Sequence, residues 1–179
     1  MKYFFDTEFI EDGKTIELIS IGIVADDGRE FYVEVQDAPF DKANQWVKDN
    51  VISHLWHRQE DKVTFNAWSR DGGQGGLMRK DEVASALRRF IGEDTNPQFF
   101  AYYADYDWVV FCQLFGRMVD LPKGFPMFCM DLKQSMEERG LTKENFNIKE
   151  LLPQENEHNA LDDARWNKKL YELIISTQL

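Results

Sequence analysis

The opening strand-like segment constrains the fold most, because it combines a buried-strand pattern with two acids. Residues 3–8 read Tyr-Phe-Phe-Asp-Thr-Glu, a run of strand-forming residues that ends in acid, threonine and acid. Side chains alternate along a strand, so Asp6 and Glu8 project from one face, close enough to share a cation. Since an unpaired carboxylate is costly to bury, the pattern predicts a core strand that carries a ligand site. The alternative is two acids at a fraying strand end, the usual interpretation of an isolated Asp-x-Glu.

A second acidic segment lies near the other end of the chain. Residues 158–165 read His-Asn-Ala-Leu-Asp-Asp-Ala-Arg. Asn159 is a good N-cap and Asp162 resembles the distal member of a capping box, so a helix is predicted to begin at the next residue, 160. At about 100° per residue, Asp163 falls within the apolar face of this helix, whereas Asp162 points outward. Asp163 is therefore the better ligand, and His158 lies on the incoming loop.

The middle segment contributes a third group of acids. Residues 99–108 read Phe-Phe-Ala-Tyr-Tyr-Ala-Asp-Tyr-Asp-Trp, which predicts a second buried strand running into a helix. Acids at the carboxyl end of a strand, where a helix begins, occupy the usual ligand-binding crevice of an open α/β sheet. Asp105 has an alternative role as a helix N-cap, the commonest role of such an aspartate. Asp107 is less easily explained as a cap, because it follows Asp105 by two positions.

Together the three segments resemble the signature of the DEDDh 3′-5′ exonucleases, a superfamily that includes RNase T, oligoribonuclease and polymerase proofreading domains. The matching residues are Asp6, Glu8, Asp107, His158 and Asp163. The opening residues 3–22 are most similar to small mycobacterial-type RNase T-like exoribonucleases. The resemblance implies an α/β, RNase H-like fold with a central mixed five-stranded sheet flanked by helices. One departure is the pair Tyr102-Tyr103, where many relatives carry His-Asn, and it bears on contacts with the substrate 3′ end.

The resemblance also implies a chemistry. Two cations, Mg²⁺ or Mn²⁺, clamp the attacking and leaving oxygens in such enzymes, and these hard ions prefer carboxylate ligands. By resemblance, Asp6 bridges the two cations and Asp107 holds the second of them. Glu8 and Asp163 complete the first site. His158 is the expected general base that takes a proton from the attacking water, since histidine ordinarily changes charge near neutral pH.

The implied reaction is hydrolysis of a single-stranded nucleic acid, RNA before DNA, from its 3′ end with release of nucleoside 5′-monophosphates. Three alternatives stay open at this point: a catalytically silent nucleotide- or RNA-binding module on the same fold, a single-stranded DNA exonuclease, and a metal-dependent phosphatase or endonuclease. The intact set of four acids and a histidine argues against the silent module, because a binding protein has no need of a general base.

The charge of the chain limits how it can hold a nucleic acid. Its 32 acidic residues against 21 basic ones give a formal net charge of −11. Bound cations would neutralise part of this charge, and the remainder argues against a long duplex-binding groove. A pocket for a few nucleotides at a 3′ end relies on stacking instead. The predicted substrate contacts, taken from positions beside the acids and from the resemblance, are Thr7, Phe9, Ile16, Glu17 and Trp108.

Outside the motifs, the sequence predicts a single domain over residues 1–179. Strands are expected over 2–7, 15–25, 29–36 and 125–130, and helices over 41–57 and 80–91, with Asp131 capping a further short helix. In the segment 41–57, one buried face is predicted for Trp46, Val47, Val51 and Leu55. The glycine-rich residues 69–76 lack the Lys-Ser/Thr of a phosphate loop, so they are interpreted as a mobile loop that flanks the active site.

Cysteine content and hydropathy bear on the cellular setting. Cys112 and Cys129 are too few for a set of metal ligands and fit a reducing interior. A core strand at the start leaves no room for a signal peptide, and no apolar run reaches membrane length. We therefore expect a cytoplasmic location without membrane association. Members of the superfamily are commonly homodimers, and the sequence neither indicates nor excludes a homodimer here.

Overall fold

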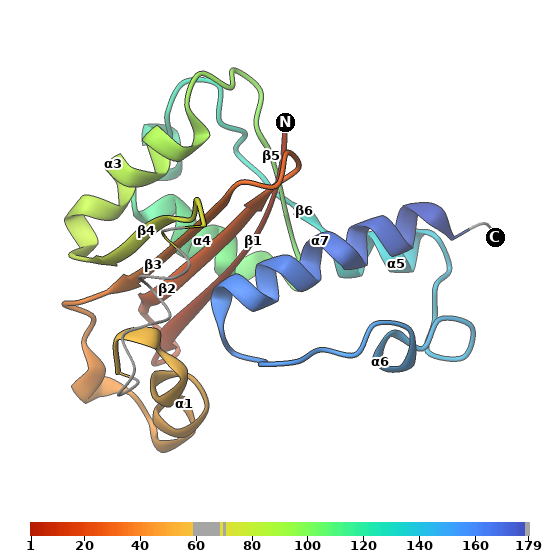
Figure 1. The fold of residues 1–179 in the computed structure, drawn as a ribbon, viewed down its shortest axis with the longest axis horizontal. Coiled ribbons are helices and arrows are strands. Elements are labelled where there is room, and N and C mark those ends of the chain that lie inside the picture. Colours follow the sequence, from red (N-terminus) through yellow and green to blue (C-terminus); the bar gives the residue numbers. More distant parts are fainter. Residues whose placement is uncertain (59–68, 70, 178–179) are drawn as a thin grey trace.

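The protein folds around one mixed β-sheet (Figure 1). The computed structural model describes residues 1–58, 69 and 71–177. Within these residues the sheet has six strands in the order β4-β3-β2-β1-β5-β6. The strands are β1 Lys2–Glu11, β2 Ile16–Ala25, β3 Glu30–Val35, β4 Gln74–Met78, β5 Gln98–Ala101 and β6 Met130–Asp131. The first three form an antiparallel meander, and the other three each pair in parallel with a neighbour.

Helices cover both faces of this sheet (Figure 1). The α-helices described are α1 Gln45–Asn50, α3 Lys80–Ile91, α4 Asp105–Gln113, α5 Leu132–Glu138, α6 Ile148–Leu151 and α7 Ala160–Ser176. Helix α7 crosses one face of the sheet, with α5 beside it, while α3 and α4 lie on the opposite face. None of the helices within the described residues combines the length and apolar character that crossing a bilayer requires.

The alternation of side chains along β1 sorts its residues between the two faces. Tyr3 and Phe5 pack into the core that includes the apolar side chains of α3 and α4. Phe4 packs into the second core, which includes side chains of α5 and α7. Because side chains alternate along a strand, Asp6 and Glu8 continue the Phe4 series and face α7. The predicted placement of both acids on one face of a core strand is thereby explained.

Helix α7 begins where the sequence predicts, at the residue after Asn159. The Asn159 side chain accepts hydrogen bonds from the backbone N–H groups of Leu161 and Asp162, both at 3.2 Å. The capping box predicted for Asp162 is wrong, because its carboxylate instead accepts a hydrogen bond from Arg165 at 2.7 Å. Asn167 is buried and donates a hydrogen bond to the carbonyl of Phe5 at 2.9 Å, which ties the helix to the central strand.

The sheet has six strands instead of the five predicted, and β4 is the strand that the sequence did not predict. The prediction of a mobile loop over 69–76 is wrong from residue 74 onward, whereas residue 70 lies outside the described residues. Residues 74–78 pair in parallel with β3. Gly75 has a φ of 133°, and a Cβ there would overlap the backbone of Tyr32. The glycine therefore permits a close approach between two strands, a role that composition alone does not separate from flexibility.

Two other predicted elements are shorter in the structure. The helix predicted over 41–57 is broken into α1 and short 3₁₀ turns, because the Asn44 side chain caps α1 and the β-branched Val51 and Ile52 disfavour its continuation. The strand predicted over 125–130 is reduced to Met130–Asp131. Asp131 does cap α5, as predicted, by accepting a hydrogen bond from the Gln134 N–H at 2.8 Å.

Candidate active site

A pocket of about 360 Å³ opens beside the carboxyl-terminal half of β1, and we call it the carboxylate pocket. Four separate parts of the chain line it: β1, the segment around α1, the beginning of α4, and the beginning of α7 with the residue just before it. The lining residues are Asp6, Thr7, Glu8, Phe9, Glu11, Asn44, Trp46, Val47, Val51, Asp107, His158 and Asp163. The three acidic motifs of the sequence therefore meet in one place.

Three carboxylates lie closest together in this pocket. One oxygen each of Asp6, Glu8 and Asp163 falls within 4.8 Å of the others. Asp6 pairs across the sheet with Gly22 on β2. A Cβ at Gly22 would overlap the backbone of Ala160, so the missing side chain lets the start of α7 rest directly on β2. This close packing brings Asp163 to the two acids of β1.

Asp107 is the fourth carboxylate, and β1 holds it in place. Its Oδ1 accepts hydrogen bonds from the Thr7 N–H at 2.9 Å and from the Thr7 hydroxyl at 2.6 Å. Thr7 is only 4 % exposed and orients Asp107, and because it also lines the carboxylate pocket, its contact with substrate stays a prediction. Asp105 is exposed and is the first residue of α4, with Ala104 as the cap residue, so the N-cap role considered for Asp105 is wrong.

The loop before α7 supports Asp163 through two donors. Asp163 accepts a hydrogen bond from the His158 N–H at 3.0 Å and another from the Gln154 side-chain amide. His158 has a φ of 70°, a left-handed conformation that is uncommon outside glycine and recurs at functional sites. The backbone of His158 thus positions a carboxylate, while its side chain lines the pocket.

A buried polar chain fixes the same loop to the sheet. The Asn159 side-chain amide donates to the Tyr32 hydroxyl at 3.3 Å, and that hydroxyl donates to Glu34 at 2.7 Å. Glu34 is fully buried and also accepts the N–H groups of Trp56 and His57, at 2.6 and 3.0 Å. Satisfied buried networks of this kind specify one local geometry. The start of α7 is therefore tied to β3 and to the segment that follows α1.

Trp46 forms a wall of the carboxylate pocket. Its ring meets the His158 ring edge to face, with centroids 4.9 Å apart. The prediction that Trp46 lies on a buried helix face is wrong, since 55 % of it is exposed, whereas Val47, Val51 and Leu55 are buried as predicted. Because the helix predicted over 41–57 is broken, Trp46 stands in the first turn of α1 and faces the pocket.

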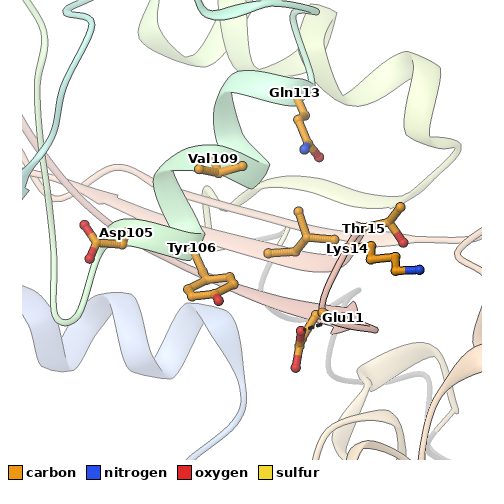
Figure 2. A pocket seen from close by; sticks show the side chains of 9 residues that line it. Glu11, Lys14, Thr15, Asp105, Tyr106, Val109 and Gln113 are labelled. Carbon is orange, nitrogen blue, oxygen red and sulfur yellow. Dashed lines mark hydrogen bonds between the residues drawn. The ribbon is translucent and has the colours of Figure 1, made fainter.

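The other predicted substrate contacts lie in different parts of the structure, and only some of them line a pocket. Phe9 lines the carboxylate pocket and stacks on Tyr106, with ring centroids 5.9 Å apart. Trp108 lies in the core, 8 % exposed and stacked on Phe111, so the structure does not bring it to the pocket. Ile16 lines a neighbouring pocket at the β1–β2 turn, the pocket drawn in Figure 2. Glu17 is paired with Lys80 at 2.6 Å and lines neither pocket.

The clustered acids hold protons more tightly than isolated ones. Burial raises the pKa of Glu8 to about 8, with the charges of Asp163 and Asp107 adding to the effect. Burial also raises the pKa of Asp163 to about 7, against the hydrogen bonds from Gln154 and His158. The pKa of Asp107 rises to about 6 for the same reason, against the hydrogen bonds from Thr7. Burial and the other three acids raise the pKa of Asp6 well above its usual value.

The acids of the carboxylate pocket have the character of ligands for a divalent cation, because no cationic side chain among the described lining residues neutralises them. Among the described residues that line the carboxylate pocket there are five acids and no Lys or Arg. Carboxylates that are buried together without a cationic side chain are destabilising when ionised. Oxygen donors of this kind are the ligands that Mg²⁺ and Mn²⁺ prefer. The donor set and its spacing therefore fit the predicted metal centre.

Without divalent cations, we expect the melting temperature to fall as the pH rises from about 6 to about 8. A carboxyl group with a raised native pKa stabilises the fold below its unfolded pKa, and that stability is lost as the pH passes through the raised value. Added Mn²⁺ should restore at least about 3 °C at the alkaline end, the scale of 1 kcal/mol for such a chain. Thermal denaturation with EDTA or Mn²⁺ measures both effects. An unchanged pH slope in Asp6→Asn would contradict this assignment.

Gly22→Ala tests whether close packing of α7 on β2 builds the site. We expect it to destabilise the protein by about 1–3 kcal/mol through overpacking and to abolish activity by displacing Asp163. Gly28→Ala is the control, because Gly28 lies in the turn after β2, at a φ of 89°, and a Cβ there would meet open space. It should lower the melting temperature while keeping activity. Full activity in a folded Gly22→Ala protein would show that the packing is not needed.

Comparison with known proteins places the chain in a family. The 3′-5′ exoribonuclease Rv2179c-like domain matches residues 1–175. The chain is 36% identical over 185 residues to the 3′-5′ exoribonuclease Rv2179c of Mycobacterium tuberculosis strain ATCC 25618 / H37Rv, covering 99% of this chain and 95% of that protein. The same values hold for the 3′-5′ exoribonuclease MT2234.1 of strain CDC 1551 / Oshkosh.

A solved structure supports the fold. The catalytic unit of Neurospora crassa Pan2, with its protease and nuclease domain, aligns with a TM-score of 0.52 at 12% identity, over 96% of this chain and 26% of that one. At this identity the likeness concerns the fold alone, and it confirms the predicted RNase H-like class. The chain belongs to the Rv2179c-like 3′-5′ exoribonuclease domain family, and the predicted resemblance to such enzymes is confirmed.

Proposed function

We propose that this protein is a divalent-cation-dependent 3′-5′ exoribonuclease of the DEDDh type, which removes nucleoside 5′-monophosphates from single-stranded RNA. The observation that carries the proposal is the meeting of Asp6, Glu8, Asp107, Asp163 and His158 in one pocket. Membership of an exoribonuclease family supports the same conclusion. Its relatives in Mycobacterium tuberculosis bear the name 3′-5′ exoribonuclease.

The proposed roles follow from the geometry of the carboxylate pocket. Asp6, Glu8 and Asp163 would hold one divalent cation, and Asp6 with Asp107 a second. When bound, two such cations stabilise charge on the attacking and leaving oxygens of a phosphodiester. Thr7 keeps Asp107 oriented by two hydrogen bonds, so that this carboxylate is preorganised before substrate arrives.

His158 has the proposed role of general base. Its side chain lines the pocket that holds the carboxylates, and in the proposed mechanism it accepts a proton from the water that attacks phosphorus. The proton would pass from the water to the imidazole as the bond to the leaving 3′-oxygen breaks. Phe9 and Trp46 line the same pocket and offer aromatic faces to the terminal base. This use of aromatic rings accords with a chain whose net charge is −11.

Product analysis tests the proposed function. Unlabelled single-stranded RNA and the corresponding DNA are incubated with the protein and Mg²⁺ or Mn²⁺, and the products are resolved by chromatography and mass. Nucleoside 5′-monophosphates, formed faster from RNA, are the expected result. Internal fragments would indicate an endonuclease, and intact but bound RNA would indicate a silent binding module. A cytoplasmic location stays a prediction from the sequence, and a homodimer stays only what the resemblance to the superfamily suggests.

A further inference from the structure

Glu34 is a buried carboxylate on β3, and it is not among the described residues that line the carboxylate pocket. One of its oxygens accepts hydrogen bonds from the Tyr32 hydroxyl at 2.7 Å and from the Trp56 N–H at 2.6 Å. The other oxygen accepts a hydrogen bond from the His57 N–H at 3.0 Å and lies 2.5 Å from Nδ1 of the same residue. A buried carboxylate with these partners holds each of them in a defined position.

Some of these partners belong to the segment that follows α1. The Trp56 ring packs on the Tyr32 ring, with centroids 4.6 Å apart. Val47 in α1 and Val51 after it are buried in one apolar cluster, so α1 and the following turns form one packed unit. Because Trp46 lies in α1, the hydrogen bonds to Glu34 also fix this wall of the carboxylate pocket.

The start of α7 is held through the Tyr32 hydroxyl. Asn159 donates a hydrogen bond to that hydroxyl at 3.3 Å, and Asn159 is itself only 5 % exposed. The same side chain caps α7 by accepting the N–H groups of Leu161 and Asp162. His158 is the preceding residue, with a φ of 70°. The hydroxyl of Tyr32 therefore limits where the backbone of His158 can lie.

The two held segments meet again at the pocket, where the Trp46 and His158 rings lie edge to face with centroids 4.9 Å apart. We propose that Tyr32 and Glu34 are positioning residues of the reaction, which set the distance between α1 and the start of α7 and so place the His158 ring in the carboxylate pocket. Both are fully buried and act through Asn159 and the segment after α1. This inference rests on the proposed function, which makes His158 the general base.

Single hydroxyl and amide groups can be removed from this network with little change in packing. Tyr32→Phe removes the hydroxyl and keeps the ring that packs on Trp56. Asn159→Ser is a second variant, because serine is a good N-cap and lacks the amide N–H that reaches Tyr32. Tyr3→Phe is the matched control: Tyr3 is also fully buried in the sheet, and its hydroxyl donates to Asp94 at 3.2 Å, away from the carboxylate pocket.

The first readout is the rate on single-stranded RNA, measured well below the melting temperature of every variant. We expect Tyr32→Phe to lower kcat by about ten- to a hundredfold, the scale of a misplaced catalytic group, with KM near the wild-type value. Asn159→Ser should lower kcat in the same direction. Tyr3→Phe should keep the wild-type kcat. Affinity for Mn²⁺ should stay unchanged in Tyr32→Phe, because the carboxylates of β1 and α7 are untouched.

The second readout follows the His158 ring by NMR and needs no hydrolysis. The chain has three histidines, and the signals of His158 are the ones that disappear in His158→Gln. An aromatic ring in contact shifts the signals of nearby protons, so these signals report the contact with Trp46. We expect them to move in Tyr32→Phe and to stay in place in Tyr3→Phe.

A lower kcat together with displaced His158 signals, in Tyr32→Phe and Asn159→Ser but not in Tyr3→Phe, supports the positioning role. Either effect without the other overturns it, and so does a wild-type result in both readouts. An equal fall of kcat in Tyr3→Phe also overturns it, because the loss then follows from any missing buried hydroxyl. Wild-type protein that leaves RNA intact contradicts the proposed function, whereas unmoved His158 signals in Tyr32→Phe contradict this inference alone.

Discussion

Asp163→Asn is expected to reduce RNA hydrolysis by about 10³-fold or more, because a metal ligand contributes several kcal/mol to stabilising the transition state. Asp163 is one of the three acids whose oxygens lie within 4.8 Å of one another. The amide keeps the shape and the hydrogen bond from the His158 N–H but removes the charge that attracts the cation. Initial rates on single-stranded RNA, together with the melting temperature, measure the loss of activity in a folded protein.

Asp162→Asn is the natural control for this variant. Asp162 is the adjacent residue in the same turn of α7, yet its carboxylate turns away from the pocket to pair with Arg165 at 2.7 Å. A partly exposed pair of this kind contributes about 1 kcal/mol or less, so activity should be retained. The metal assignment would be contradicted if both variants kept wild-type turnover, or if both lost it equally.

The second large effect is expected at His158. Replacement by glutamine should lower kcat by about 10²–10⁴-fold, the usual range for loss of a general base. The hydrogen bond from position 158 to Asp163 comes from the backbone N–H, so it survives the change of side chain. Affinity for Mn²⁺, measured by titration calorimetry, should therefore stay near the wild-type value while kcat collapses. Partial recovery of the rate with added imidazole is expected.

A purely structural role for His158 would give a different pattern. Loss of its contact with Trp46 would then lower Mn²⁺ affinity and the melting temperature along with kcat. Trp46→Phe serves as a control for that contact, because it keeps an aromatic ring against His158 and leaves the imidazole in place. A His158→Gln protein with wild-type kcat would remove the general-base assignment.

The sequence predicted the positions of the clustered acids better than those of the residues around them. Period-two alternation in β1 was enough to place Asp6 and Glu8 on one face, and helical periodicity was enough to turn Asp163 inward while Asp162 faces outward. Both are local rules of backbone geometry that need no knowledge of the rest of the fold. The N-cap at Asn159 followed from the same kind of rule.

Features that depend on contacts between distant segments were missed. Trp46 has the spacing of a core residue, and only the break after α1 turns it toward the pocket. Gly22 reads as an ordinary strand residue until α7 is packed on it. The glycines of β4 were interpreted as a flexible loop. Glycine is common both in flexible loops and where two strands approach closely, so the sequence does not separate these roles. The Gln154 side chain donates a hydrogen bond to Asp163, and no sequence motif indicates this role.

The lining of the carboxylate pocket explains part of the net charge of −11. Five acids line the carboxylate pocket without a Lys or Arg among its described lining residues. Aromatic side chains, Phe9 and Trp46, stand beside them. Under the proposed function, cations supply the attraction for the phosphate and stacking supplies the attraction for the bases. Such an enzyme depends less on a broad basic surface than a protein that grips a duplex.

Under the proposed function, the carboxylate pocket hydrolyses RNA from the 3′ end with the help of divalent cations. The most direct test is a time course with 5′-labelled single-stranded RNA, resolved by length, with Mg²⁺ and with EDTA. We predict a ladder that shortens one nucleotide at a time from the 3′ end with Mg²⁺, and intact RNA with EDTA. Cleavage that persists in EDTA, or that starts at internal positions, would contradict the account.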